Sequence, residues 1–399
     1  MPYDYKDMKN RQSSEKVRDL IDELPVYYQK FLVGREGKMS AETRFIYTHR
    51  VSMFFTFLVE KQYFGDKQKK DITLSELGSL TTEDIELFAS WIRHGNASSG
   101  KNMDNKETTV NNYLSALNMF YSYFVRRGQL PYNPVAGVER GRAAKHGVIR
   151  LNDRQKEQFF DCIITGEQLT DHQKRFHDKN ALRDEAICLT LVRTGLRVSE
   201  LVGLNVEDVS FEDCSLTVLR KGNKYDTVFF DDEVAEILTE YLEHRKLIVT
   251  DPSEKALFLV TIGKYKGTRL SVRSVEKMVK KYAVAGAPTA GSKITPHKLR
   301  ATYATDMLIA TNNLSLVQKA LNHESPRTTT IYADYRTIEL EKARNTLLSA
   351  KQSELKANQQ VFFKKKRIQK TKKNFSGKTS QNERYHKVNK KNIIDEIDK

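Results

Sequence analysis

The chain has only three cysteines among its 399 residues, and Cys162, Cys188 and Cys214 are far apart in the sequence. An odd number of cysteines, with no CxxC pair and no neighbouring histidine pair, is typical of reduced thiols in a cytoplasmic protein. It argues against a disulfide framework and against a zinc site. We therefore expect no disulfide, no bound metal and no cofactor.

Long hydrophobic runs are absent as well. No stretch approaches the roughly 20 apolar residues that cross a bilayer, and the first residues do not have the pattern of a secretory signal. The formal net charge is +16, which in a chain without a membrane segment favours nucleic acid over an anionic membrane as the partner. We expect a cytoplasmic protein that binds nucleic acid and does not contact membranes.

The positive charge is concentrated near the end of the chain. Residues 351–399 contain 15 lysines and arginines but only 5 aspartates and glutamates, and they supply most of the net charge of +16. They include the sequence KKKR at residues 364–367 and few large apolar residues. This composition predicts a basic tail that is disordered when free and that binds DNA phosphates without sequence specificity.

Helical periodicity dominates residues 25–130. Apolar residues recur there at helical spacing in three separate segments, and Thr81 with Asp84 has the spacing of a capping box. Residues 1–24 are polar and charged, with a weak helical pattern. We expect an N-terminal extension over residues 1–24, followed by a helical bundle over residues 25–130.

Residues 131–148 contain two prolines and few large apolar residues. We interpret them as a linker between two domains. Their basic residues Arg140, Arg142 and Lys145 are candidate DNA contacts, because a basic linker can follow the phosphates if the domains on either side bind nucleic acid. The alternative, that these charges only solvate an exposed linker, fits the composition equally well.

Residues 149–350 form the second predicted domain. Residues 216–219 and 227–230 flank a Gly-Asn pair in the pattern of a β-hairpin, with Lys221 near its tip. The rest of this domain has helical periodicity. The predicted fold class is therefore mainly α: a helical bundle, then a mostly helical α+β domain with a small antiparallel sheet.

Side chains suited to phosphate chemistry gather between residues 295 and 335. A Thr-Pro helix start places His297 and Arg300 one turn apart on one face, near the amide-rich end of a helix where anions bind. His323 follows an asparagine suited to a left-handed helix end, and a Ser-Pro helix start precedes Tyr332. Taken singly, each of these residues also has an ordinary structural explanation.

A hundred residues earlier, Arg197 is predicted at a corner between two helices. A helical pattern stops at Gly195 and another begins at Val198, within the sequence TGLRVSEL. RKGNK then surrounds Lys221, HKLR spans residues 297–300, and LNH is followed nine residues after its histidine by a tyrosine. In this order and spacing the chain resembles the tyrosine recombinases, or phage integrase superfamily, most closely the short Xer-like and transposon-type integrases.

The resemblance covers residues 40–348, approximately, and the basic tail lies outside it. It implies that the helical bundle is a core-binding domain, which grips one side of a DNA half-site, and that residues 149–350 are the catalytic domain. It also implies six catalytic residues, namely Arg197, Lys221, His297, Arg300, His323 and Tyr332.

Three of these residues would bind the reacting phosphodiester. The guanidinium groups of Arg197 and Arg300 stay protonated and fork onto phosphate oxygens, so they can stabilise the charge that develops there. The resemblance assigns to His323 a hydrogen bond to the same phosphate. This chemistry is phosphoryl transfer without a metal.

The other three would move protons and form the covalent bond. By resemblance, Tyr332 attacks the phosphate to give a 3′-phosphotyrosyl enzyme and a free 5′-hydroxyl. His297 is the candidate general base, and Lys221 at the hairpin tip is the candidate acid for the leaving oxygen. No ATP is required, because the phosphotyrosyl link conserves the bond energy.

Two of these assignments have close rivals. Tyr335 lies one turn beyond Tyr332, and only the nine-residue interval in the family favours Tyr332. Lys224 competes with Lys221 in the same hairpin. Glu200 is a supporting residue near the site in the family, although a solvated helix charge is an equally good interpretation.

The sequence departs from the family pattern at three places. Asn322 stands where glycine is usual, Ala301 where a histidine often follows, and Tyr225 with Asp226 where the hairpin commonly has a second basic residue. None of these positions belongs to the six catalytic residues. The change in the hairpin would weaken a DNA contact.

The resemblance also implies the partners. A short amphipathic helix over residues 340–348 would dock onto a neighbouring protomer, giving a homotetramer on two paired double-stranded DNA recombination sites, with a possible accessory directionality factor. We expect a site-specific recombinase that integrates and excises a mobile element. Xer-type resolution of chromosome or plasmid dimers, a type IB topoisomerase and a catalytically inactive DNA-binding protein are the alternatives.

Overall fold

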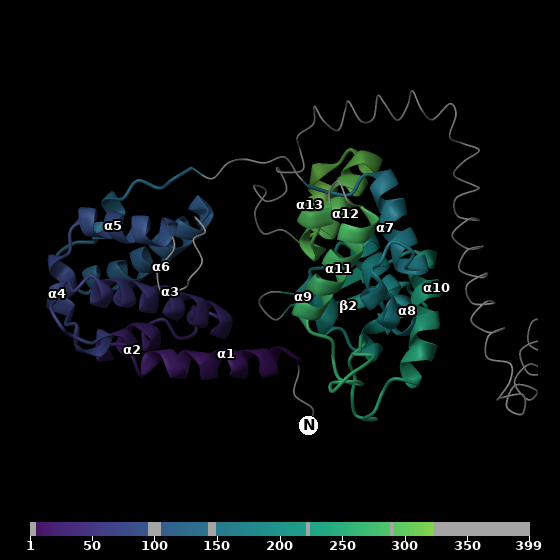
Figure 1. Cartoon of the computed structure of the whole chain (residues 1–399), viewed down its shortest axis with the longest axis horizontal. Coiled ribbons are helices and arrows are strands. Elements are labelled where there is room, and N and C mark those ends of the chain that lie inside the picture. Colours follow the sequence, from purple (N-terminus) through teal and green to yellow (C-terminus); the bar gives the residue numbers. More distant parts are fainter. Residues whose placement is uncertain (1–4, 95–104, 143–148, 221–223, 288–290, 323–399) are drawn as a thin grey trace, which may run out of the picture. The chain divides into compact units, whose positions relative to one another are not determined.

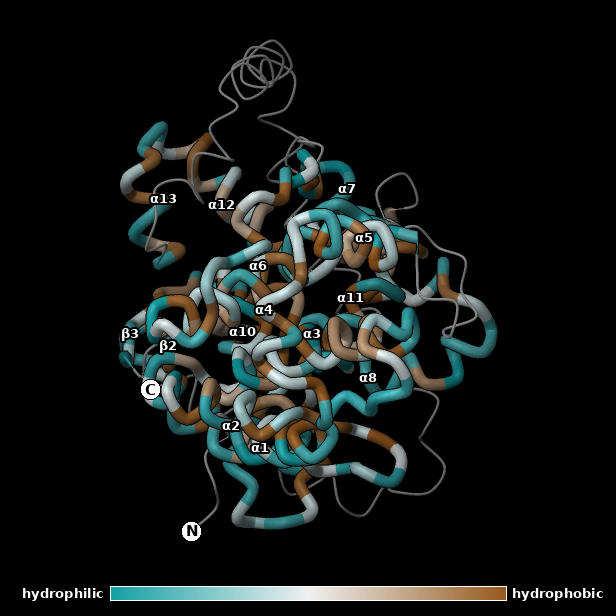
Figure 2. Tube along the Cα trace, turned by 90° about the vertical axis from the view of Figure 1, so that its left-hand side faces the viewer, coloured by the Kyte–Doolittle hydropathy of each residue, from teal (hydrophilic) through white to brown (hydrophobic). Residues whose placement is uncertain are grey.

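The computed structural model describes residues 5–94, 105–142, 149–220, 224–287 and 291–322. The chain divides into two compact units, residues 1–145 and 146–399 (Figure 1). Figure 2 shows hydrophobic and hydrophilic residues interleaved along the helices of both units. Within the described ranges, no helix is long and apolar enough to span a membrane.

The first unit is a bundle of helices around an aromatic core. Phe54, Phe88 and Phe120 are fully buried and come from three different helices, and the rings of Phe54 and Phe88 meet edge to face with their centroids 5.1 Å apart. Such pairs stabilise a core beyond the burial of their area. Its helices are α1 (Tyr5–Ile21), α2 (Val26–Val33), α3 (Ala41–Glu60), α4 (Leu74–Ser79), α5 (Thr82–Arg93) and α6 (Glu107–Val125).

Local sequence signals account for several helix starts in this unit. Ser40 accepts a hydrogen bond from the amide of Thr43 at the start of α3. The capping box predicted at Thr81 is confirmed, because the Thr81 side chain accepts from the Asp84 amide while the Asp84 carboxylate accepts from the Thr81 amide. These bonds satisfy amides that have no partner inside the helix.

The helix α1 was not predicted beyond a weak helical pattern. It packs along α3, and Val17, together with Leu24 just after the helix, belongs to the core of the bundle. Among its described side chains only Ser13 and Val17 are buried. So short an apolar face leaves little periodicity in the sequence.

Part of the segment interpreted as a linker is packed on α6. A 3-10 turn at Pro134–Gly137 contacts α5 and α6, and Val135 is buried in the core of the bundle. The side-chain amide of Asn133 donates to Asn118 Oδ1 at 2.8 Å and to Ser122 Oγ at 2.9 Å. Further along, the side chain of Asn111 on α6 donates to the carbonyl of Gly141. Hydrogen bonds with α6 therefore hold this segment at both of its ends, residues 133 and 141.

The described part of the second unit is mostly helical and contains one small sheet. Helix α8 lies at its centre, in contact with α7, α10 and α12. The helices are α7 (Asp153–Thr165), α8 (Asp171–Thr194), α9 (Val198–Gly203), α10 (Asp232–Lys246), α11 (Val272–Gly286), α12 (Pro296–Thr311) and α13 (Leu314–Ala320), and the strands are β1 (Val209–Ser210), β2 (Ser215–Arg220) and β3 (Lys224–Phe229).

The three strands form an antiparallel sheet in the order β1-β2-β3. The β2–β3 hairpin was predicted and β1 was not. Residue pairs run from Ser215 opposite Phe229 to Arg220 opposite Lys224. A helical bundle followed by a mostly helical unit with a small antiparallel sheet confirms the predicted fold class.

A buried polar network holds α8 to its neighbours. The Arg183 guanidinium donates to Asp184 Oδ1 at 2.6 Å and to the carbonyl of Leu259 at 3.1 Å. The Tyr282 hydroxyl donates to the other carboxylate oxygen of Asp184 at 2.9 Å. Because these groups satisfy one another, their burial is tolerated and α8 is held against α11 and the segment of Leu259.

Candidate functional site

Arg300 connects three segments that are far apart in the sequence. It lies one turn into α12, its side chain is only 2% exposed, and its guanidinium donates to the main-chain carbonyls of Gly195 and Leu321. Gly195 lies two residues before Arg197, and Leu321 lies two residues before His323. The buried arginine thus holds the chain next to two other predicted site residues.

The corner that carries Arg197 depends on Gly195. This residue ends α8 in the left-handed conformation, with φ +64°, and a side chain at this position would overlap the ring of Tyr303 on α12. Only glycine satisfies both conditions without strain. The tight corner then turns the chain into α9, with Arg197 at its N-terminal cap position.

Glu200 fixes Arg197. Its Oε1 accepts from Arg197 Nη1 at 2.7 Å, and its Oε2 accepts from the Arg197 amide at 2.8 Å. The Glu200 side chain is 5% exposed, whereas that of Arg197 is 40% exposed. Of the two interpretations of Glu200, the supporting residue is therefore favoured over the solvated charge, and Arg197 is held while part of it still faces solvent.

Arg220 joins the same cluster from the end of β2. Its Nη1 donates to Glu200 Oε2 at 2.7 Å and its Nε donates to Asp226 Oδ2 at 3.1 Å. The side chain is 3% exposed. The sequence analysis did not predict a role for this arginine. A signal was present, because alternate residues of a strand point to the same face, and Arg220 follows the buried Leu216 and Val218 on that face.

His297 occupies the first turn of α12. Its partial burial lowers its pKa, and the positive charges of Lys298, Arg300 and Arg197 lower it further. The shift keeps the imidazole neutral near pH 7, the form in which a histidine can accept a proton. Since two of these charges belong to Arg197 and Arg300, the three side chains share one electropositive region.

Several predicted residues lie outside the described ranges. They are Lys145, Lys221, His323 and Tyr332, the rival Tyr335, and the helix expected over residues 340–348. The chain is described up to Asn322, which has a φ of +47°, as the predicted left-handed helix end requires. The rival Lys224 is described, and its side chain is exposed at the start of β3.

Two of the basic linker residues proposed to contact DNA, Arg140 and Arg142, lie within the described ranges. Arg140 donates to Ser115 Oγ at 2.7 Å and to the carbonyl of Asn111 at 3.4 Å. Arg142 is exposed. The α6 helix therefore holds the side chain of Arg140 in one orientation, and its role in DNA binding stays a prediction.

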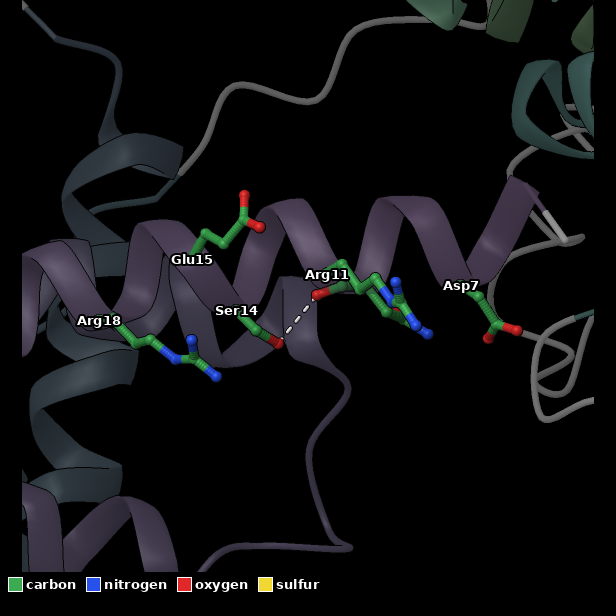
Figure 3. A pocket seen from close by; sticks show the side chains of 6 residues that line it. Asp7, Arg11, Ser14, Glu15 and Arg18 are labelled. Atoms are coloured by element: carbon green, nitrogen blue, oxygen red, sulfur yellow. Dashed lines mark hydrogen bonds between the residues drawn. The ribbon is translucent and has the colours of Figure 1, made fainter. Parts of the chain in front are cut away.

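A hollow of about 590 Å³ on α1 is a poor candidate for the chemistry. Figure 3 shows its lining side chains, among them Arg11, Glu15 and Arg18, with Ser14 donating to the carbonyl of Asn10 at 2.8 Å. The described residues that line it all belong to this one helix. Functional groups from other elements do not converge there within the described part of the chain.

The described residues contain no cluster of three or more histidine, cysteine or acidic side chains suited to a metal ion. The three cysteines are free thiols. Burial raises the pKa of Cys162 to about 11, so this thiol is protonated at neutral pH and is a poor nucleophile.

Comparison with known proteins shows which family the chain is similar to. Residues 165–339 match the phage integrase family. The tyrosine recombinase XerC of Vibrio cholerae is 33% identical over 247 residues, which cover 62% of this chain and 73% of that protein. The tyrosine recombinase XerS of Lactococcus lactis is 28% identical over 347 residues, covering 82% of this chain and 96% of that protein.

Among solved structures, the integrase of the Tn1549 transposon in complex with circular intermediate DNA has a similar fold. The TM-score is 0.54 at 20% sequence identity, and the match covers 76% of this chain and 94% of that one. At this identity the likeness concerns the fold alone.

Proposed function

Because the chain belongs to the phage integrase family of tyrosine recombinases, enzymes that cleave and rejoin DNA, we propose that it is a site-specific recombinase acting through a 3′-phosphotyrosyl intermediate. The observation that carries the proposal is the position of Arg300. It brings the corner of Arg197 and the end of α13 together near the start of α12. Three of the four sequence motifs therefore meet around one guanidinium.

In this proposal Arg197 and Arg300 bind the phosphodiester. Both are permanently charged, and both are preorganised, Arg197 by Glu200 and Arg300 by two carbonyls. Fixed cations stabilise a charge that develops on phosphate oxygens without reorganising during the reaction. His323 adds a hydrogen bond to the same phosphate.

The proposed covalent step is a transesterification. The phenolic oxygen of Tyr332 forms a bond to phosphorus while the bond from phosphorus to the 5′-oxygen breaks. His297 receives the phenolic proton, and its lowered pKa suits this role. Lys221 gives a proton to the departing 5′-oxygen. A 5′-hydroxyl from a second strand then reverses these transfers and rejoins the DNA.

Lys221→Ala tests the acid. Cleavage of ordinary DNA is expected to slow by about 10²–10⁴-fold, because the 5′-oxygen then leaves without a proton. On a substrate with sulfur at the bridging position, cleavage should return close to the rate of the unmodified enzyme, because a thiolate leaves unprotonated. Equal defects on both substrates would remove Lys221 from this role, and rescue of Lys224→Ala instead would transfer the role to Lys224.

For the biological role, we propose integration and excision of a mobile element by a homotetramer on two DNA sites. The basic tail over residues 351–399 supports it. The second candidate is Xer-type dimer resolution, which the similarity to XerC and XerS supports. We also propose that the protein acts in the cytoplasm and that a directionality factor assists it.

A two-site recombination assay separates these roles. A mobile-element enzyme should release a circle from DNA in which the element is flanked by the sequences beside its gene. A dimer-resolving enzyme should act only on a repeated chromosomal or plasmid site. Relaxation of supercoils without pairing of sites would indicate a topoisomerase, and binding without cleavage would indicate an inactive DNA-binding protein.

Deletion of residues 351–399 tests the tail. These residues carry most of the excess positive charge and none of the proposed catalytic groups. The truncated enzyme should bind non-specific DNA more weakly and with a shallower dependence on salt, because fewer counterions are released. Cleavage of a single site at saturating DNA should stay near the full-length rate. Loss of cleavage with unchanged binding would instead make the tail part of the active assembly.

A further inference from the structure

Arg220 occupies a position that the six proposed catalytic residues do not explain. It is the last residue of β2, its side chain is 3% exposed, and it lies between two carboxylates. One of them, Glu200, comes from α9 and also holds Arg197. The other, Asp226, comes from β3. The guanidinium thus connects both strands of the hairpin to the helix of Arg197.

We infer that Arg220 is a positioning residue that sets the place of Lys221 relative to Arg197. This inference rests on the proposed function, in which Lys221 is the acid. Arg220 is the last residue of β2 and is bonded to Lys221 in the chain, so whatever holds the end of β2 also fixes the point at which Lys221 is attached. Bonds at 2.7 Å to Glu200 and 3.1 Å to Asp226 hold that end.

The two carboxylates around Arg220 indicate that this residue links the hairpin to α9 and does more than fill space. A buried cation without partners would be costly, but here each of the two carboxylates binds a different nitrogen of the guanidinium. A hydrophobic residue of similar length could fill the same space without tying the hairpin to α9. Asp226 also stands where the family commonly has a second basic residue, and here it pairs with Arg220.

Loss of Arg220 should leave Arg197 in place. Glu200 binds Arg197 through Oε1 to the guanidinium and through Oε2 to the main-chain amide, and neither bond involves Arg220. Removal of Arg220 therefore frees the end of β2 while the phosphate-binding arginine stays fixed. The expected defect is confined to the step that Lys221 performs.

The experiment compares cleavage of ordinary DNA with cleavage of DNA that has sulfur at the bridging position. Arg220→Met should slow cleavage of ordinary DNA by about 10–100-fold, because displacement of a catalytic group by a fraction of an ångström is costly. On the sulfur substrate, which needs no acid, the rate should lie within about threefold of the unmodified enzyme. A defect of equal size on both substrates would overturn the inference.

Asp226→Asn is a second variant that spares the buried part of the cluster, because the Asp226 side chain is 42% exposed. It should show a smaller defect, about threefold to tenfold, that is also rescued by sulfur. Asp226 Oδ1 also accepts from the Thr227 amide at 3.0 Å, and an asparagine can keep that bond. In the Arg220→Met background the substitution should therefore have no further effect, because the only bond it weakens is the one to Arg220. If the defects of the two substitutions add in the double variant, Asp226 does not act through Arg220.

Arg245→Met is the matched control. Arg245 is another buried arginine of this unit, and it donates to the carbonyls of Ala256 at 2.9 Å and Glu254 at 2.7 Å. Its loss should lower the melting temperature without changing the ratio of the rates on the two substrates. If Arg245→Met changes this ratio as Arg220→Met does, the effect of Arg220 is only structural.

Lys221→Ala in the same assay keeps the two proposals apart. If its defect is not rescued by sulfur, the assignment of the acid fails. If Lys221→Ala is rescued and Arg220→Met is not, the acid stands and the inference about Arg220 fails.

Discussion

Tyr332→Phe is expected to abolish the covalent protein–DNA adduct while binding to half-site DNA stays unchanged. The substitution removes only the phenolic oxygen, which in the proposed mechanism forms the bond to phosphorus. The two guanidiniums that bind the phosphate are fixed by Glu200 and by the carbonyls of Gly195 and Leu321. They do not depend on the tyrosine.

A nicked suicide substrate provides the measurement, because the cleaved fragment diffuses away and the phosphotyrosyl link is trapped. Tyr335→Phe is the control, and it should still trap the adduct at a rate close to that of the unmodified enzyme. If Tyr335→Phe fails to trap and Tyr332→Phe succeeds, the nucleophile is Tyr335. The interval of nine residues after His323 would then be a misleading guide.

Local signals in the sequence were sufficient for the elements that present the site. The glycine at position 195, the hairpin around residues 221–223 and the Thr-Pro start of α12 each depend on a few neighbouring residues. Turn and cap chemistry is short-range, so spacing along the chain predicts it well. The same holds for the left-handed Asn322.

Contacts between distant segments could not be predicted in this way. Arg300 donates to the carbonyl of Gly195, which lies 105 residues away in the sequence. A Thr-Pro start shows that Arg300 lies one turn into a helix, but a main-chain carbonyl carries no sequence signal of its own. The pairing of Arg220 with Glu200, 20 residues apart in the sequence, was unpredictable for the same reason.

Two further elements were missed because their apolar signal is small. Helix α1 buries Val17 and little else among its described side chains, and β1 has only two residues, Val209 and Ser210. Both are held by packing or pairing against a stronger neighbour, α3 in one case and β2 in the other. Tertiary contacts, which a single sequence does not display, decide their structure.

The two arginines of the site should respond differently to alanine. Arg300→Ala removes a buried group and leaves the carbonyls of Gly195 and Leu321 without their donor, which should lower the free energy of unfolding of the second unit by about 2–5 kcal/mol. Arg197→Ala removes a side chain that is 40% exposed, and Glu200 keeps its bond to Arg220. Its effect on stability should be below about 1 kcal/mol.

Cleavage should nevertheless fall in both variants, by about 10²–10³-fold or more, because each loses a cation that stabilises the phosphate. Urea unfolding followed by circular dichroism measures the stability, and trapping on the nicked substrate measures cleavage. Trp91, the single tryptophan, lies in the first unit, so its fluorescence transition should stay unchanged and serves as the internal control.

An Arg300→Ala protein as stable as the parent would show that the two carbonyl contacts do not support the fold. An Arg197→Ala protein that cleaves at the parental rate would place the phosphate elsewhere.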